Sequence, residues 1–85
     1  MSPVEIYTSP FCGYCHAAKR LLKGKGVSFS EVNVVTSPKR KQEMIQRANG
    51  GRTVPQIFIS GKHVGGCDEL YALERAGKLD RLLSA

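Results

Sequence analysis

Two cysteines, Cys12 and Cys15, stand three residues apart where an apolar, β-branched run gives way to a helical pattern. On a regular helix such residues have Cβ atoms about 5–6 Å apart, whereas a disulfide needs about 3.5–4.5 Å. The gap closes only if Cys12 lies at the loose start of the helix. Unpaired N–H groups and the positive end of the helix dipole also stabilise a thiolate there. The spacing therefore predicts reversible thiol–disulfide chemistry, with Cys12 exposed and Cys15 more buried.

A stabilised thiolate affects more than one step of such chemistry. The thiolate fraction of Cys12 rises at neutral pH, but the intrinsic nucleophilicity of the sulfur falls by a similar factor. We therefore expect the stabilised thiolate to make Cys12 a better leaving group and to influence the redox balance. We expect little effect on the rate of the attack itself.

The same pattern is compatible with two kinds of bound group. A CxxC pair is also half of a zinc site, for which Cys67, His16 or His63 would have to supply the other ligands. Together with His16, the pair matches the C-x-x-C-H pattern of covalent haem attachment. The chain has no second CxxC and no HxxxH, and a strand pattern without an export signal precedes Cys12. Redox chemistry is the favoured interpretation, and both alternatives stay open at this point.

The segments around the pair alternate between strand and helix patterns. Val4–Thr8 alternates apolar and polar residues as a strand does, and a helical period predicts a helix over 13–24. The run 27–35 is rich in Val and Phe and predicts a second strand, parallel to the first through a right-handed crossover. The predicted apolar face of the helix consists of Cys15, Ala18 and Leu22.

The second half of the chain carries turn and cap signals that separate further short segments. The predicted segments are a helix from Ser37-Pro38 to Asn49-Gly50-Gly51, strands over 54–60 and 62–64, a helix from Asp68 to Gly77, and a short turn over 79–83. The order β-α-β-α-β-β-α is that of the α/β thioredoxin-like fold, with a mixed four-stranded sheet and helices on both faces. These segments position the cysteine pair at a strand-to-helix junction.

Length and composition narrow the class of protein. Residues 1–85 are enough for a single domain with one modest core, and three cysteines are too few for a secreted disulfide scaffold. No apolar run approaches the roughly 20 residues that span a bilayer. The N-terminal residues resemble no secretory signal, so we expect a cytoplasmic protein without membrane association.

The net charge of +6 is concentrated in one part of the chain. Residues 1–52 contain nine Lys or Arg against three Glu, whereas residues 53–85 contain four basic and four acidic side chains. Such a distribution is compatible with a solvated basic surface or with attraction of a small anion or an acidic partner. Nucleic acid is the disfavoured alternative.

Three motifs in this order resemble those of small bacterial-type dithiol glutaredoxins. They are Cys12-Gly13-Tyr14-Cys15, Thr53-Val54-Pro55 and Gly65-Gly66-Cys67-Asp68, and the likeness covers nearly the whole chain. Tyr14, the last motif and the presence of Phe11 in place of the tryptophan of thioredoxins favour glutaredoxin over thioredoxin.

The resemblance implies a reaction and partners. Cys12 would attack glutathione mixed disulfides, and Cys15 would act as the resolving thiol when disulfides of proteins are reduced. Glutathione would be the electron donor for protein disulfides and glutathionylated thiols, with a separate glutathione reductase recycling its oxidised form. We expect the chain to act as a monomer.

The resemblance also implies a glutathione site. Its predicted members are Tyr14 in the groove, Thr53, Val54 and Pro55 in a loop with a cis proline, Gly66, Cys67 and Asp68 around the γ-glutamyl carboxylate, and Arg40 and Arg52 near the glycyl carboxylate. Lys39, Lys41 and Arg47 compete for the last role. Without the resemblance, Pro55 would be expected to be trans, and Cys67 is equally compatible with a small buried apolar residue and with an auxiliary redox role.

Two departures from the family pattern bear on this assignment. Many relatives have proline where this chain has Gly13, and a lysine where it has Ser9. Without the proline ring we expect a looser helix start, and without the lysine one glutathione contact is missing. Some relatives lacking that proline hold a [2Fe–2S] cluster between two subunits, with the first cysteine and glutathione as ligands. A cluster bound through Cys12 is therefore the alternative function.

Overall fold

The computed structural model describes residues 2–84, which contain four strands and four helices. Their bounds are β1 Val4–Thr8, α1 Gly13–Gly24, β2 Ser30–Asn33, α2 Pro38–Arg47, β3 Gln56–Ile59, β4 Lys62–Gly65, α3 Cys67–Arg75 and α4 Leu79–Ser84. This order is the one predicted from the sequence, with the final turn extended into a short helix.

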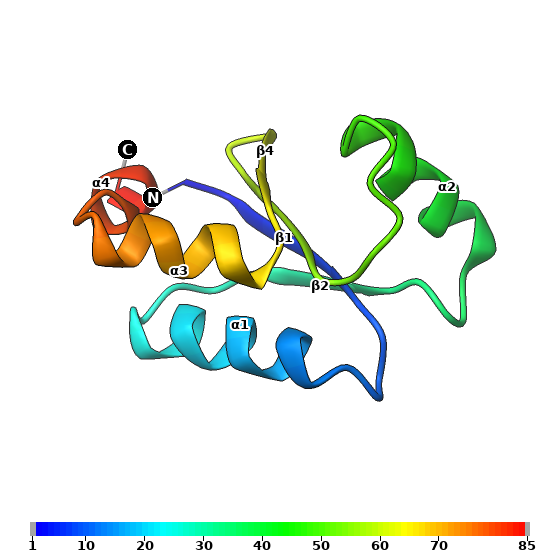
Figure 1. The fold of residues 1–85 in the computed structure, drawn as a ribbon, viewed down its shortest axis with the longest axis horizontal. Helices are drawn as coiled ribbons and strands as arrows, with labels where there is room; N and C mark the ends of the chain where they lie inside the picture. The colour runs from blue at the N-terminus through cyan, green and yellow to red at the C-terminus, as the bar shows by residue number, and fades with distance from the viewer. Residues whose placement is uncertain (1, 85) are drawn as a thin grey trace.

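The strands form one mixed sheet in the order β2-β1-β3-β4. β1 pairs parallel to β2, with Tyr7 opposite Val32, and antiparallel to β3, with Tyr7 opposite Gln56. β4 pairs antiparallel to β3 and forms an edge of the sheet. Figure 1 shows α1 starting at one end of the sheet, where the chain leaves β1. The parallel first half and the antiparallel second half are both confirmed.

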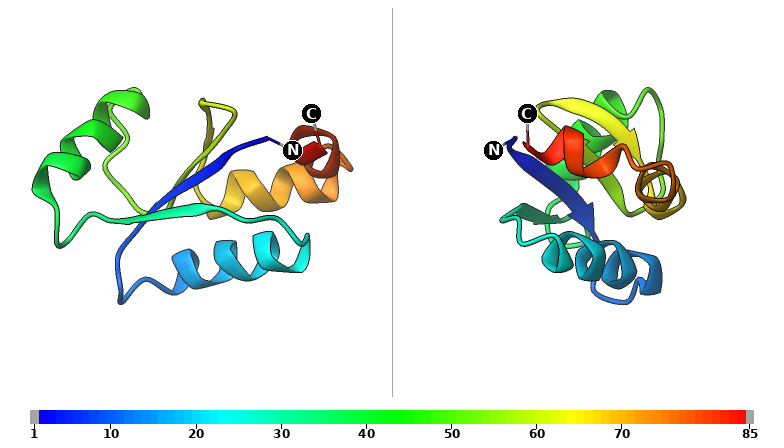
Figure 2. Two further views of the ribbon diagram at one scale, coloured as in Figure 1. Left: turned by 180° about the vertical axis from the view of Figure 1, so that it is seen from behind. Right: turned by 90° about the vertical axis from the view of Figure 1, so that its left-hand side faces the viewer.

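Helices cover the two faces of the sheet unequally, as the views in Figures 1 and 2 show. One face packs Ile6 and Ile57 against α1, α3 and α4, in a core that includes Leu22 and Leu70. The other face packs Tyr7 and Phe58 against α2, mainly through Met44 and Ala48. The sheet therefore separates a three-helix side from a side covered by a single helix.

The first helix buries the face that its sequence period predicts. Cys15, Ala18 and Leu22 are all fully buried, and Lys25 follows as its C-cap. Because these residues recur every three to four positions, they form one stripe against the sheet. The cysteine pair is thus tied to the buried face of α1 through Cys15.

Two predicted strands are longer than the observed ones. The run 27–35 contributes only Ser30–Asn33, because Val27 and Phe29 pack against the core from a connecting segment. The Asn33 side chain ends the strand by accepting the N–H of Val35 at 2.9 Å, a local turn that competes with the ladder. In the run 54–60 the strand begins only at Gln56, after Pro55, which has no N–H to donate.

Helix starts also differ in detail from the prediction. Ser37 occupies the N-cap position of α2, but its side chain makes no capping hydrogen bond there. The third helix begins at Cys67, one residue before the predicted Asp68, with Gly66 as its N-cap. Both differences concern the first turn, where neighbouring side chains decide which N–H group is capped.

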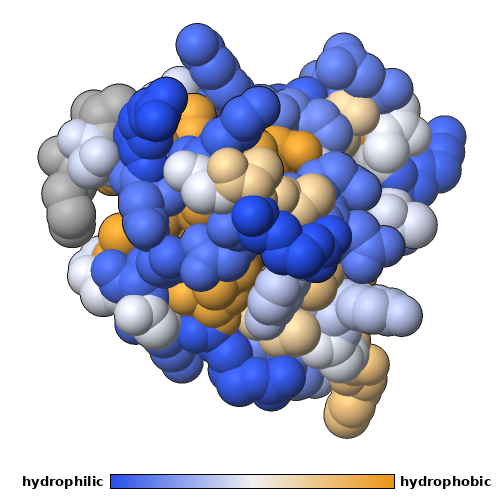
Figure 3. All heavy atoms as spheres, turned by 60° about the vertical axis from the view of Figure 1, so that its left-hand side comes forward, coloured by the Kyte–Doolittle hydropathy of each residue, from blue (hydrophilic) through white to orange (hydrophobic). Residues whose placement is uncertain are grey.

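One face of the molecule is rich in polar side chains. Figure 3 shows one face on which polar side chains leave smaller patches of apolar surface between them. Across residues 2–84 there is no helix with the length and apolar character that spanning a membrane requires.

Candidate active site

Cys12 is the N-cap of α1, in the extended conformation that helix caps adopt. Its Sγ accepts a hydrogen bond from the backbone N–H of Cys15 at 3.1 Å. The same sulfur lies 3.6 Å from the Val54 carbonyl oxygen, to which a thiol at this position donates. The residue is partly exposed. Cys12 therefore has the predicted place at the helix start, between a backbone donor that stabilises a thiolate and a backbone acceptor that stabilises a thiol.

Cys15 has the opposite environment one turn further along α1. Its side chain is fully buried, and both cysteines are free thiols in this structure. Burial, followed by the hydrogen bond with Cys12, raises the pKa of Cys15 to about 12. The two sulfurs are therefore chemically distinct, because one is accessible and the other retains its proton at neutral pH.

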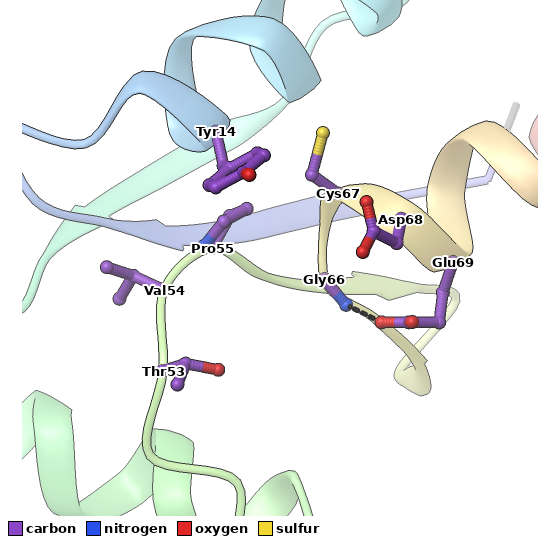
Figure 4. Close-up of a pocket in the computed structure, with 8 residues that line it drawn as sticks. All are labelled: Tyr14, Thr53, Val54, Pro55, Gly66, Cys67, Asp68 and Glu69. Carbon is purple, nitrogen blue, oxygen red and sulfur yellow. Dashed lines mark hydrogen bonds between the residues drawn. The ribbon is translucent and has the colours of Figure 1, made fainter.

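A cavity of about 360 Å³ opens beside the cysteines. It lies between α1, the loop before β3 and the start of α3, and Figure 4 shows Tyr14 and Pro55 on one side of it and the start of α3 on the other. Its lining residues are Tyr14, Thr53, Val54, Pro55, Gly66, Cys67, Asp68 and Glu69. The cavity falls within the size range of small-ligand sites, roughly 300–1,000 Å³. The structure thus gathers seven of the predicted site residues around one hollow next to Cys12.

The loop that forms one wall of this cavity contains the cis proline that the resemblance implies. The Val54–Pro55 peptide bond is cis. Thr53 is exposed and Val54 partly exposed, whereas Pro55 is buried. Thr53 and Val54 are therefore accessible from the cavity, while Pro55 is anchored in the protein.

The start of α3 forms the opposite wall. The Gly66 N–H donates to Glu69 Oε1 at 2.7 Å, which Figure 4 shows as a dashed line. Gly65, just before it, has φ +121°, a conformation that side chains rarely adopt. An anion at this helix end would meet the N–H groups of Cys67 and Asp68, since Glu69 already occupies that of Gly66.

Cys67 is 8% exposed and belongs to the main core, although it also lines the cavity. Burial raises the pKa of Cys67, and the negative charge of Asp68 raises it further. A buried, protonated thiol fits the description of a small apolar residue. An auxiliary redox role for Cys67 stays a prediction.

Arg40 and Arg52 do not line the cavity. Arg40 lies on α2 and its Nε donates to Glu43 Oε2 at 2.8 Å, whereas Arg52 is exposed in the loop just before Thr53. The ion pair neutralises the charge on Arg40 locally. Their predicted contact with a glycyl carboxylate stays a prediction, and Arg52 is the better placed of the two.

Glu69 is a member of this site that the sequence motifs did not predict. The signal was present, because a glutamate three residues after an N-cap can reach back to the N-cap N–H as half of a capping box. Gln56, which contacts Thr53 from outside the cavity lining, was not predicted either, and no local pattern points to it.

Within residues 2–84, no three or more His, Cys, Asp and Glu side chains gather where they could hold a metal ion. The zinc alternative would have to bring Cys67, His16 or His63 to the CxxC pair. A cluster bound between subunits would rely on Cys12 and on ligands from outside the chain, and no contact in the described part of the chain favours it.

Comparison with known proteins gives a consistent result. A family model described as Glutaredoxin matches residues 4–64. The chain is 56% identical to Glutaredoxin of Pseudomonas aeruginosa over 85 residues, the full length of both chains. It is 55% identical to Glutaredoxin 3 of Escherichia coli strain K12 over 83 residues, which cover 98% of this chain and 99% of the relative.

Solved structures agree with the sequence relatives. The crystal structure of a buckwheat glutaredoxin–glutathione complex matches with a TM-score of 0.89 and 32% identity, covering 98% of this chain and 77% of that one. The fold is therefore thioredoxin-like, and family and fold together support a thiol–disulfide oxidoreductase. With its motifs, fold and relatives in agreement, the chain belongs to the glutaredoxin family.

Proposed function

We propose that this protein is a glutathione-dependent reductase of protein disulfides and glutathionylated thiols. The observation that carries the proposal is the position of Cys12 Sγ. It lies at the start of α1, accepts the Cys15 N–H, and is 3.6 Å from the carbonyl oxygen of Val54 on the wall of the cavity. A disulfide held along that wall would present its sulfur to Cys12.

Glutathione suits the chemical character of the cavity. Its backbone can pair with the Val54 N–H, which no group in the described part of the chain accepts, and its γ-glutamyl carboxylate can accept the free N–H groups at the start of α3. The Asp68 carboxylate, also in the wall, complements the ammonium group of the same γ-glutamyl end. The buckwheat relative, whose structure is a complex with glutathione, supports this choice of ligand.

On a glutathionylated protein, the reaction needs Cys12 alone. The Cys12 thiolate attacks the glutathione sulfur, forms a mixed disulfide with glutathione, and releases the protein thiolate, which takes up a proton. A second glutathione thiolate then attacks the glutathione sulfur of that mixed disulfide. Oxidised glutathione leaves and the Cys12 thiolate is restored, and a glutathione reductase recycles the product.

On a protein disulfide, both cysteines take part. Cys12 attacks one sulfur and forms a mixed disulfide with the substrate, and Cys15 then loses its proton and attacks Cys12. The substrate leaves as a dithiol, and two glutathione molecules reduce the Cys12–Cys15 disulfide to complete the cycle. Because the raised pKa of Cys15 keeps it protonated before that step, Cys15 does not compete with Cys12 for substrate.

The test compares wild type, Cys12→Ser and Cys15→Ser on two substrates, a glutathionylated peptide and a protein disulfide. We expect Cys12→Ser to abolish turnover of both substrates. We expect Cys15→Ser to retain turnover of the glutathionylated peptide within about threefold and to lose reduction of the protein disulfide. Equal loss of peptide turnover in both variants would contradict this division of roles.

The electron donor is tested separately. We expect glutathione with glutathione reductase to support turnover, and a thioredoxin-type flavoprotein reductase not to. We further propose that the protein works in the cytoplasm as a monomer. Sedimentation of the reduced protein tests the oligomeric state.

A further inference from the structure

A buried glutamine connects the sheet to the loop that forms the cavity wall. Gln56 is the first residue of β3 and is 6% exposed. Its Nε2 donates to the Thr53 carbonyl oxygen at 3.0 Å and lies 3.5 Å from Thr53 Oγ1. A buried amide that donates to a loop carbonyl holds that carbonyl in one direction.

The other end of the amide is held by a histidine on the edge strand. Gln56 Oε1 lies 2.6 Å from His63 Nε2. Since the Gln56 nitrogen faces Thr53, its oxygen faces His63, so His63 carries a proton on Nε2 and donates it. The amide therefore cannot turn over without losing both contacts.

The histidine is exposed at the edge of the sheet, and one face of its ring packs on an aromatic neighbour. It lies across the β3–β4 pair from Phe58, with ring centroids 5.1 Å apart. Phe58 is buried, and the Arg47 guanidinium lies over the Phe58 ring, 4.1 Å from its centroid. The contacts with Phe58 and Gln56 together orient the His63 ring at the sheet edge.

Peptide geometry carries this constraint into the cavity. In a trans peptide the C=O of one residue and the N–H of the next point in opposite directions. Holding the Thr53 carbonyl toward Gln56 therefore turns the Val54 N–H away from Gln56. No group in the described part of the chain accepts that N–H, and Val54 also supplies the carbonyl near Cys12.

We propose that Gln56 and His63 are positioning residues that aim the Val54 N–H at the backbone of a bound glutathionyl group. Gln56 acts through the Thr53 carbonyl, and His63 acts through Gln56. Neither side chain lines the cavity or touches the reacting sulfurs. This inference rests on the proposed glutathione-dependent function. It explains how the loop of residues 53–55 is oriented to bind glutathione.

The experiment uses Gln56→Leu, which removes the donor at similar size, and His63→Phe, which keeps the ring and removes the hydrogen bond. Tyr7→Phe is the matched control. Tyr7 is buried directly opposite Gln56 on β1, and its hydroxyl bonds Glu43 and Arg47 instead of the loop. Each variant is assayed with a glutathionylated peptide as substrate, with glutathione, glutathione reductase and NADPH regenerating the enzyme.

We expect Gln56→Leu to raise KM for the glutathionylated peptide about tenfold with kcat within about twofold, as one lost binding hydrogen bond predicts. We expect His63→Phe to raise KM about threefold, and the double variant to match Gln56→Leu, because both residues act in one series. Tyr7→Phe should keep KM within about twofold of wild type. An unchanged KM in Gln56→Leu, or an equal rise in Tyr7→Phe, overturns the proposal.

A second measurement separates this inference from the proposed function. In ¹H–¹⁵N spectra of the reduced, unliganded protein, we expect the Val54 amide resonance to move in Gln56→Leu and His63→Phe and to stay in place in Tyr7→Phe. If the wild type fails to turn over the glutathionylated peptide, the proposed function fails, and the Val54 resonance still decides whether Gln56 orients the loop. An unmoved resonance in Gln56→Leu refutes the positioning role whatever the activity.

Discussion

Two residues of one type, three positions apart, have different chemical environments. Cys12 is partly exposed at the N-cap and meets backbone polar groups, whereas Cys15 is fully buried in the helix face that packs on the sheet. Burial disfavours the charged form of a thiol, so the proton stays on Cys15. This asymmetry gives each sulfur its own step in the proposed cycle.

At the residue scale we predict a stability loss at high pH that depends on Cys15. The folded state holds the Cys15 proton to a pKa of about 12, whereas the unfolded thiol releases it above about pH 8.5. The stabilisation is therefore complete below that pH and is lost as pH rises toward 12. Urea unfolding under reducing conditions at pH 7.5 and 10.5 should show a larger fall for wild type than for Cys15→Ala. Parallel falls would contradict the assignment.

At the element scale, Arg47 adds polar contacts to the apolar packing that holds α2 on its face of the sheet. Arg47 donates from both terminal nitrogens to the Glu5 carboxylate, each at 2.9 Å, and its guanidinium lies 4.1 Å from the centroid of the Phe58 ring. These contacts join the last turn of α2 to β1 and β3. They also belong to the face from which Gln56 and His63 reach the loop.

We predict that Arg47→Met destabilises the protein by about 1–2 kcal/mol, from the lost paired hydrogen bonds and cation–π contact. The Arg47 hydrogen bonds hold the pKa of Glu5 below its ordinary value. That contribution is present above the unfolded pKa of about 4.3 and disappears as pH falls through the folded value. Urea unfolding should therefore show a difference between wild type and variant that shrinks below about pH 4. A constant difference would exclude Glu5 as the partner.

The start of α3 is the second element on which the site depends. At Gly65, with φ +121°, an added Cβ would lie 2.7 Å from Glu69 Oε1 and 3.0 Å from Glu69 Cβ. We predict that Gly65→Ala costs about 1–3 kcal/mol of stability, because the backbone is strained and the Glu69 cap is displaced. Gly24→Ala in α1 is the control, since its Cβ meets nothing within 4 Å. Thermal unfolding should show a lower Tm only for Gly65→Ala.

At the scale of the whole molecule, the charge of +6 acts on any anionic ligand. We predict that kcat/KM for a glutathionylated peptide falls about two- to fivefold between roughly 20 and 300 mM NaCl, because salt screens this attraction. Alkylation of Cys12 gives a control independent of glutathione. As the salt concentration rises, the rate of alkylation by anionic iodoacetate should fall relative to the rate with neutral iodoacetamide. A ratio that does not fall with salt would show that the net charge does not reach the site.

The sequence by itself determined the features that depend on local patterns. Alternation in Val4–Thr8 and the helical period from residue 13 placed the CxxC pair at a strand-to-helix junction, and cap signals placed most segment ends within a few residues. The three motifs were enough to name the family. Local periods report which face of a segment is buried, so the helical pattern alone distinguishes the buried Cys15 from Cys12 at the helix start.

Only the tertiary structure decided which distant residues meet. The Val54 carbonyl lies beside Cys12 across 42 positions of sequence, and His63 reaches Gln56 from the edge strand. It also decided that Arg40 lies outside the lining of the cavity. Such contacts depend on strand order and register, which the whole core selects together and no short stretch of chain encodes.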